Sequence, residues 1–260
     1  MKLDIYQADA FTSEVFGGNP AALVPLKEWL PDETLLNIAI ENNLSETAYI
    51  VPDGEKFHLR WFTPGGEVEL CGHATLATSF IMFDQLGYDK DMITFSSLSG
   101  DLFVHKKDNG LMMDFPIWDR ERTETPEEVI RAFGREPVAY FKGHDDMAVF
   151  DDPQFIRELN PNHSALKELS SRGVLVTSRG DQDYDFISRA FFPKLGIEED
   201  PVTGSAHCIL TPYWAEQLGK TSMKAHQASA RGGDLWLNLK DERLEITGQA
   251  VMYMKGEIYI

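Results

Sequence analysis

The chain has 260 residues, of which 43% are hydrophobic and 25% charged, an ordinary globular composition that suits one large domain or two small ones. Its formal net charge of -18 excludes a polyanionic partner such as nucleic acid. Two cysteines make no disulfide framework, Asp4 and Asp9 stand where a signal peptide needs apolar residues, and no apolar run approaches the ~20 residues of a membrane span. We therefore expect a cytoplasmic protein without membrane contact, whose partner is a small molecule.

The N-terminal part of the chain contains two turn-like segments. F-G-G-N-P-A-A-L-V, from Phe16 to Val24, predicts a turn that enters a small-residue segment. N-N-L-S-E-T-A-Y-I-V, from Asn42 to Val51, predicts the end of a helix, a turn and the start of a strand. Glu46 stands in this turn, and from the residues alone it reads more readily as a solvated acid than as a catalytic group.

The two halves of the chain repeat three segments in the same order. F-x-x-R-x-F-x-P begins at Phe57 and again at Phe186, an offset of 129 (186 minus 57). A segment that ends in acid-Gln-Leu-Gly begins at Cys71 and again at Thr203, an offset of 132 (203 minus 71). G-D-L recurs in a third pair of segments, which begin at Gly100 and at Gly233. Because the offset drifts so little, the sequence predicts a duplication.

Each half predicts the same order of secondary-structure elements. A strand runs into Pro, a short loop follows, and Gly72 or Gly204 opens a helix of about sixteen residues that stops at Q-L-G with Gly as its cap. Both helices are apolar or small nearly all round, so we expect them to be buried on all sides.

The predicted fold is therefore α+β, with two similar halves that each wrap a barrel-like, mostly antiparallel sheet around a central helix. The expected boundaries are residues 1–116 and 117–260, with the last strand a candidate to pack back on the first half. The charged segment I-W-D-R-E-R-T-E-T, which begins at Ile117, is the expected linker.

The starts of the two central helices are the candidate sites. A helix N-terminus presents unpaired N–H groups and the positive end of a dipole, which suits a carboxylate or an oxyanion. His73 lies at N1 or N2 of the first helix, where the residues alone favour a structural histidine. Asp200 lies just before the second helix, where a loop or capping acid explains it as well as a functional role does. Thr203 and Ser205 are readily explained as caps, and G-S-A-H lacks the nucleophile-elbow pattern of serine hydrolases.

Other sites are not indicated by any pattern. The remaining histidines show no metal-ligand spacing, and the chain has neither a phosphate-loop motif nor G-x-G-x-x-G. We therefore predict no metal and no nucleotide cofactor.

Four segments resemble signatures of the PhzF-like (phenazine-biosynthesis) isomerase family, and F-G-G-N-P-A-A resembles its N-terminal segment. The four segments are N-L-S-E-T-A-Y from Asn43, F-T-P from Phe62, E-L-C-G-H-A-T from Glu69 and E-D-P-V-T-G-S-A-H from Glu199. The resemblance implies a diaminopimelate epimerase-like fold with the site between the halves, a homodimer, and proton transfer without a cofactor. In the phenazine enzyme, a glutamate of the S-E-T segment shifts a proton on dihydro-3-hydroxyanthranilate.

The resemblance also implies roles for individual residues. Glu46 would be the general acid/base, and His73 and Asp200 its supporting polar groups. Substrate would be bound by four residues: Ser45, Gly72, Gly204 and Ser205.

Racemases resembling diaminopimelate epimerase use two cysteines, each just before a Gly at a helix start. Cys71 fits this pattern, but its repeat partner is Thr203, and Cys208 lies four residues inside the helix (208 minus 204). A two-thiol mechanism needs an acid and a base on opposite faces of one carbon, which this chain does not supply. An epimerase that uses Cys71, and a binding protein without turnover, stay as alternatives to the isomerase.

Overall fold

The computed structural model describes residues 1–181 and 183–260, and the chain divides into two compact units. The first comprises Met1–Asp114 and Thr247–Ile260, and the second comprises Phe115–Ile246. The sequence placed the boundary after residue 116 and left the last strand as a candidate to pack on the first half. This division falls after Asp114 and assigns the end of the chain to the first unit. The segment expected to be a linker is not one throughout, because Arg120–Thr123 forms strand β9 and pairs with β10 (Ala139–Gly143).

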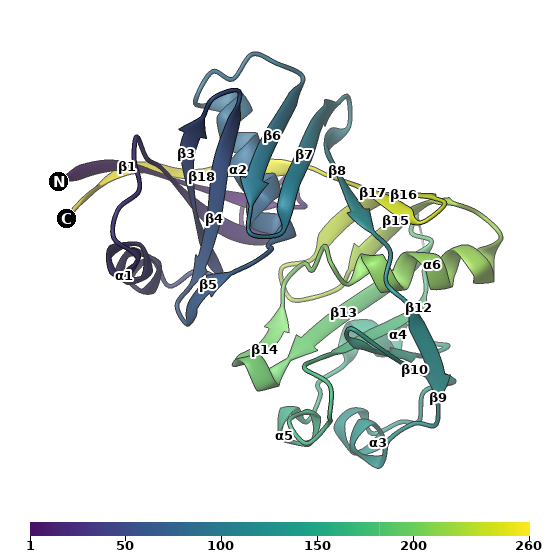
Figure 1. Ribbon diagram of the computed structural model, residues 1–260. Helices are drawn as coiled ribbons and strands as arrows, with labels where there is room; N and C mark the ends of the chain where they lie inside the picture. Colours follow the sequence, from purple (N-terminus) through teal and green to yellow (C-terminus); the bar gives the residue numbers. More distant parts are fainter. Residues whose placement is uncertain (182) are drawn as a thin grey trace. The chain divides into compact units, whose positions relative to one another are not determined.

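The first unit is built from strands around one central helix (Figure 1). Its strands are β1 (Lys2–Ala10), β2 (Asn19–Pro25), β3 (Glu46–Asp53), β4 (Lys56–Thr63), β5 (Gly66–Val68), β6 (Met92–Ser97), β7 (Gly100–Lys107), β8 (Gly110–Pro116) and β18 (Ala250–Tyr259). Its helices are α1 (Asp32–Asn42) and α2 (Gly72–Asp84). The chain ends meet here, since β1 pairs antiparallel with β18 and the Ile260 N–H donates to the Met1 carbonyl. Apolar side chains from β1, β2 and α1 form a core cluster that includes Ile5, Val24 and Leu35.

The second unit has a similar composition of elements. Its further strands are β11 (Asp146–Val149), β12 (Val174–Arg179), β13 (Phe186–Phe192), β14 (Ile197–Asp200), β15 (Ser222–Gln227), β16 (Gly233–Lys240) and β17 (Arg243–Gly248). Its helices are α3 (Glu127–Phe133), α4 (Pro153–Glu158), α5 (His163–Leu166), the 3-10 helix η1 (Pro193–Leu195) and α6 (His207–Leu218). A core cluster that includes Phe133, Phe150 and Phe191 joins its short helices to its sheet.

The two units share one strand topology, which confirms the predicted duplication. In the first, β2 and β3 are parallel, β3 and β4 antiparallel, β4 and β6 parallel, and β6 and β7 antiparallel. In the second, β11, β12, β13, β15 and β16 repeat this sequence of pairings. The register agrees as well. Phe57 pairs with Phe95, which pairs with Leu102, and the repeat partners Phe186 and Leu235 are joined in the same way through Ala225. Most pairings are antiparallel, so the predicted α+β class is confirmed.

The two long helices are buried as predicted, but their ends differ from the sequence pattern. In α2, residues 73–79 are all buried, and the helix packs against β1, β2, β3 and β18 (Figure 1). It ends at Asp84 with Gln85 as its cap, before the Gly of Q-L-G. In contrast, α6 ends at the predicted Gly219 in the left-handed region, with φ of 66°. It begins at His207 rather than Gly204, because Gly204–Ala206 forms a tighter turn closed by the His207 N–H on the Gly204 carbonyl. In the described part of the chain, no helix combines the length and the apolarity that crossing a membrane requires.

The duplication also preserves an ion pair between neighbouring strands. Arg60 on β4 donates to both carboxylate oxygens of Glu67, and Arg189 on β13 donates in the same way to Glu199. Both partners keep their repeat offsets, 129 for the arginines (189 minus 60) and 132 for the glutamates (199 minus 67). Such two-point pairs fix the geometry of the strands that carry them, here the strands that lead into the central helices.

Replacing Glu199 by Gln is expected to destabilise the protein more than the matched change Glu67→Gln. Arg189 is buried, and when the carboxylate is lost its hydrogen-bond partners among the described residues are the carbonyls of Ile156 and Leu159, whereas Arg60 keeps the carboxylate of Asp32. We expect a loss of about 2 kcal/mol in the free energy of unfolding for Glu199→Gln and about 1 kcal/mol or less for Glu67→Gln. Urea unfolding checks this, and equal losses would contradict the assigned role of Asp32.

Candidate functional site

Glu46 is placed by the predicted order of helix, turn and strand. Helix α1 ends at Asn42, and Asn43 follows in the left-handed region with φ of 49°, which turns the chain. Strand β3 then begins at Glu46, whose parallel partner on β2 is Ala21. The Glu46 side chain is 13% exposed, so it is not the solvated turn acid that the residues alone suggested.

His73 lies opposite this carboxylate. It is the second residue of α2, whose N-cap is Cys71, and its side chain is 7% exposed. The Nε2 atom of His73 is 2.9 Å from Oε2 of Glu46. Neither atom makes a well-directed hydrogen bond within the described structure, so the contact is an ion pair. The Nε2 atom of His73 and the Oε2 atom of Glu46 can therefore still hydrogen-bond to a third group.

The charge state of His73 follows from its neighbours. Burial opposes the imidazolium form, but Cys71 and Glu46 outweigh it and hold the pKa of His73 well above its usual 6.5. Burial, with the Glu46 carboxylate, raises the pKa of the Cys71 thiol to about 11. Since the thiol is then neutral at pH 7, we assign the stabilising charge to Glu46. His207 shows the opposite case, since burial without an acidic partner lowers its pKa to about 4.

Two further groups contact the other ring nitrogen of His73. The side-chain amide nitrogen of Asn19 lies 3.2 Å from Nδ1, and the Cys71 sulfur lies 3.5 Å from it. Asn19 is fully buried at the start of β2. Because an amide offers a donor on one side and an acceptor on the other, Asn19 can serve Nδ1 with or without its proton. Sequence reasoning missed Asn19, although it stands inside the F-G-G-N-P segment that the resemblance included.

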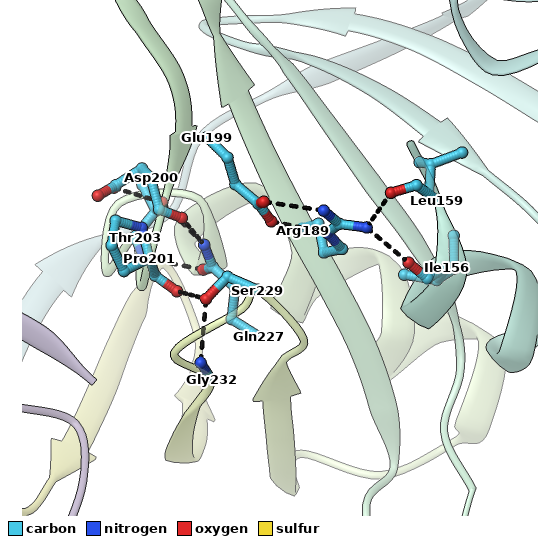
Figure 2. A network of polar contacts seen from close by, with 10 residues as sticks. All are labelled: Ile156, Leu159, Arg189, Glu199, Asp200, Pro201, Thr203, Gln227, Ser229 and Gly232. Carbon is cyan, nitrogen blue, oxygen red and sulfur yellow. Dashed lines mark hydrogen bonds and ion pairs between the residues drawn. The ribbon is translucent and has the colours of Figure 1, made fainter. Parts of the chain in front are cut away.

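The second unit holds Asp200 in a separate network (Figure 2). The Thr203 hydroxyl donates to Oδ2 of Asp200 over 2.6 Å. Gln227, which is fully buried, accepts from the Thr203 N–H and donates to the Asp200 carbonyl, each over 2.8 Å. Ser229 donates to the carbonyl of Pro201 in the same loop. The loop before α6 is therefore fixed from β15, and nothing in the sequence singled out Gln227.

The remaining predicted residues divide between the units. Ser45 and Gly72 adjoin Glu46 and His73 in the chain, and both are half-buried. Gly204 and Ser205 belong with Asp200 to the second unit, within the turn that precedes α6. The structure thus brings Glu46 and His73 together, and the substrate-binding roles of the other residues stay predictions.

The second unit does not repeat the Glu46–His73 pair. Thr47 pairs with Phe62, and Val174 pairs with Phe191, the repeat partner of Phe62 (191 minus 62 is 129), so Gly173 stands where the first unit has Glu46. A Cβ atom at Gly173 would lie 2.1 Å from the Phe192 ring, which leaves no room for a side chain. The residue after the repeated Gly is Ser205 rather than a histidine.

The Glu46→Gln variant is expected to lower the pKa of His73 by roughly one to three units, because an opposite charge at this distance raises a pKa by that much. A histidine NMR titration of both proteins measures the shift, with the buried His207 as an internal reference. An unchanged His73 titration would show that Glu46 does not hold the imidazolium.

Comparisons with known proteins identify the family of the chain. Residues 8–256 match the profile of the PhzC-PhzF family, described as phenazine biosynthesis-like protein. An isomerase of Pseudomonas aeruginosa, described as uncharacterized, is 46% identical over 260 residues, and one of Halalkalibacterium halodurans is 43% identical over 265, each comparison covering both chains fully.

Solved structures place the chain in the same family. A PhzF family protein of Enterococcus faecalis has a TM-score of 0.98 at 46% identity, with both chains fully covered. A probable proline racemase of Agrobacterium radiobacter has a TM-score of 0.67 at 10% identity over 99% of this chain and 93% of that one, a likeness of fold alone. The chain belongs to the PhzC-PhzF family of phenazine biosynthesis-like proteins.

Proposed function

We propose that the protein is a cofactor-independent isomerase that shifts a proton within a small metabolite, with Glu46 as the proton carrier. The observation that carries this proposal is the buried contact of 2.9 Å between Glu46 and the imidazole of His73. Perturbed ionisable groups at partly buried positions are typical of catalytic sites. The isomerase names of the relatives support the reaction class, and none of those names specifies a substrate.

The chemistry assigned to Glu46 needs both of its protonation states. As a carboxylate it takes a proton from a carbon of the substrate, and as the acid it returns the proton to another atom of the same molecule. His73 lies against the carboxylate throughout, so its positive charge can stabilise negative charge that develops on the substrate when the proton leaves. The N-terminus of α2, where Gly72 and His73 are the first residues, adds its dipole to the same end of the site.

The asymmetry of the duplication supports a one-carboxylate mechanism. Inversion at one carbon needs an acid and a base on opposite faces, whereas a shift between two atoms needs one group that takes and returns the proton. The positions equivalent to Glu46 and His73 in the second unit are Gly173 and Ser205, and packing against Phe192 excludes a side chain at the first of these. We assign to the second unit the roles that the resemblance implies, a supporting role for Asp200 and substrate binding for Gly204 and Ser205.

A cysteine-assisted epimerase is the second candidate, because the Cys71 sulfur lies 3.5 Å from Nδ1 of His73. Two observations weigh against it. The pKa of the thiol is raised to about 11, which leaves little thiolate at neutral pH, and its repeat partner is Thr203. A binding protein without turnover is the third candidate. The burial of Glu46 beside a histidine with a raised pKa favours catalysis over this alternative, since perturbed ionisable groups cluster at functional sites.

The experiment is solvent-deuterium incorporation into candidate cyclic and amino-acid-like metabolites, dihydro-3-hydroxyanthranilate among them, with three forms of the protein. Glu46→Gln is expected to lower the rate by about 10²- to 10⁴-fold, the usual contribution of a general acid/base, because the amide cannot carry the proton. Binding of the same metabolite, followed by calorimetry, is expected to survive because the side chain keeps its shape.

Cys71→Ala is the matched comparison, and we expect it to keep most of the rate. Near-total loss in Cys71→Ala with activity retained in Glu46→Gln would establish the thiol mechanism and contradict the proposal. A cytoplasmic location and a homodimer are part of the proposal, and gel filtration tests the second.

A further inference from the structure

Three side chains of different chemistry converge in the first unit. Glu46, Cys71 and His73 each offer one ligand atom, and the carboxylate oxygen, the sulfur and the ring nitrogen all lie within 4.8 Å of one another. Their sequence spacing is that of no common metal motif, since Glu46 comes from the start of β3 and the other two from the start of α2. The parallel pairing of β2 with β3 and the packing of α2 on both strands bring them together.

The donor set is the one that zinc prefers. Zn²⁺ binds thiolate sulfur at about 2.3 Å, imidazole nitrogen at about 2.0–2.1 Å and carboxylate oxygen at about 2.0–2.2 Å, in tetrahedral geometry. Two ligands of one such ion therefore lie about 3.3–3.7 Å apart. Nε2 of His73 and Oε2 of Glu46 are 2.9 Å apart, and the three ligand atoms lie within 4.8 Å of one another. Shifts of about 1 Å or less, which side-chain rotations supply, bring the three atoms into this range.

Two polar atoms of this cluster also lack a directed hydrogen bond within the part of the chain that the structure describes. Oε2 of Glu46 and Nε2 of His73 are buried and make no directed hydrogen bond among the described residues. Buried polar atoms of this kind mark a place for a water, an ion or a ligand. Binding of the cation displaces the protons of the Cys71 thiol and of the His73 imidazolium into solvent. The thiolate and the carboxylate then carry two negative charges, which offset the opposition of the positive end of α2.

We propose that the protein binds one thiophilic divalent cation, of which Zn²⁺ is the type, through Glu46, Cys71 and His73, and that the bound ion is an inhibitor. The cation occupies the carboxylate and the imidazole, the two groups on which proton transfer by Glu46 rests. Asn19, 3.2 Å from Nδ1 of His73, is placed to orient the imidazole. Hard cations such as Mg²⁺ and Ca²⁺ are excluded, because they avoid thiolate and imidazole ligands.

The test uses Co²⁺ as a spectroscopic probe for Zn²⁺ and needs no substrate, so its outcome is separate from that of the isomerase proposal. Titration of the metal-free protein under anaerobic conditions is expected to show saturation at one Co²⁺ per chain. The spectrum is expected to show the visible bands of a tetrahedral ion and a thiolate-to-cobalt charge-transfer band. Zn²⁺ is expected to displace Co²⁺ and raise the thermal midpoint, whereas Mg²⁺ leaves both unchanged.

The two cysteines provide a matched pair of variants. Cys71→Ser is expected to abolish the charge-transfer band and to weaken binding by more than the roughly 10- to 100-fold that losing an outer partner costs. Cys208→Ser is the control, because this thiol is buried in α6 of the second unit, and it is expected to keep the band unchanged. His73→Gln provides a second test of the site, should Cys71→Ser fail to fold by circular dichroism.

Two results would overturn the proposal. One is the absence of saturable Co²⁺ binding by the wild-type protein. The other is a charge-transfer band that persists in Cys71→Ser or disappears in Cys208→Ser, because the ion would then lie elsewhere in the chain.

Discussion

The ion pair between Glu46 and His73 is the interaction on which the rest of the site depends. The His73 side chain is only 7% exposed, and burial alone favours its neutral form, so the nearby Glu46 carboxylate is what holds the imidazolium. The pair joins the first residue of β3 to the second residue of α2, so it requires both the turn at Asn43 and the burial of α2 against β2 and β3. Asn19 and Cys71 then constrain the ring from its other nitrogen.

The two units share their strand framework and differ in the polar side chains near the start of the central helix. Both units retain the parallel and antiparallel pairings around a buried helix and the Arg–Glu pair beside it. In the second unit, the Phe192 ring packs against Gly173, and the loop before α6 is held by Gln227 instead of a charged pair. The first unit thus carries the proposed proton carrier with its imidazole partner, and the second carries the hydrogen-bonded network of Asp200, Thr203 and Gln227. This difference between the units is what separates the proposed proton shift from a symmetrical racemase mechanism.

Much of this architecture could be predicted from the sequence, because the repeat offsets and the two helices that are apolar or small nearly all round carry local signals. The turn before Glu46 was predictable for the same reason, since Asn43 suits the left-handed region. The helix ends were less predictable. Whether Gly87 or Gln85 caps α2, and where α6 begins, is decided by packing rather than by the Q-L-G pattern.

The contact of Glu46 with His73 was implied only by family resemblance, because it joins residues 27 positions apart (73 minus 46) through strand pairing. Asn19 and Gln227 are polar residues in strands, and no local pattern distinguishes them from surface residues.

The most direct measurement of the central claim is a double-mutant cycle on the free energy of unfolding, with Glu46→Gln, His73→Gln and the double variant. A charged, buried pair predicts a coupling energy of about 1 kcal/mol or more at pH 6. Because the folded-state pKa of His73 is raised, this contribution is fully present below the unfolded value of 6.5 and is lost as the pH rises through the folded-state pKa. A coupling energy near zero at pH 6, or one that grows with increasing pH, would contradict the account.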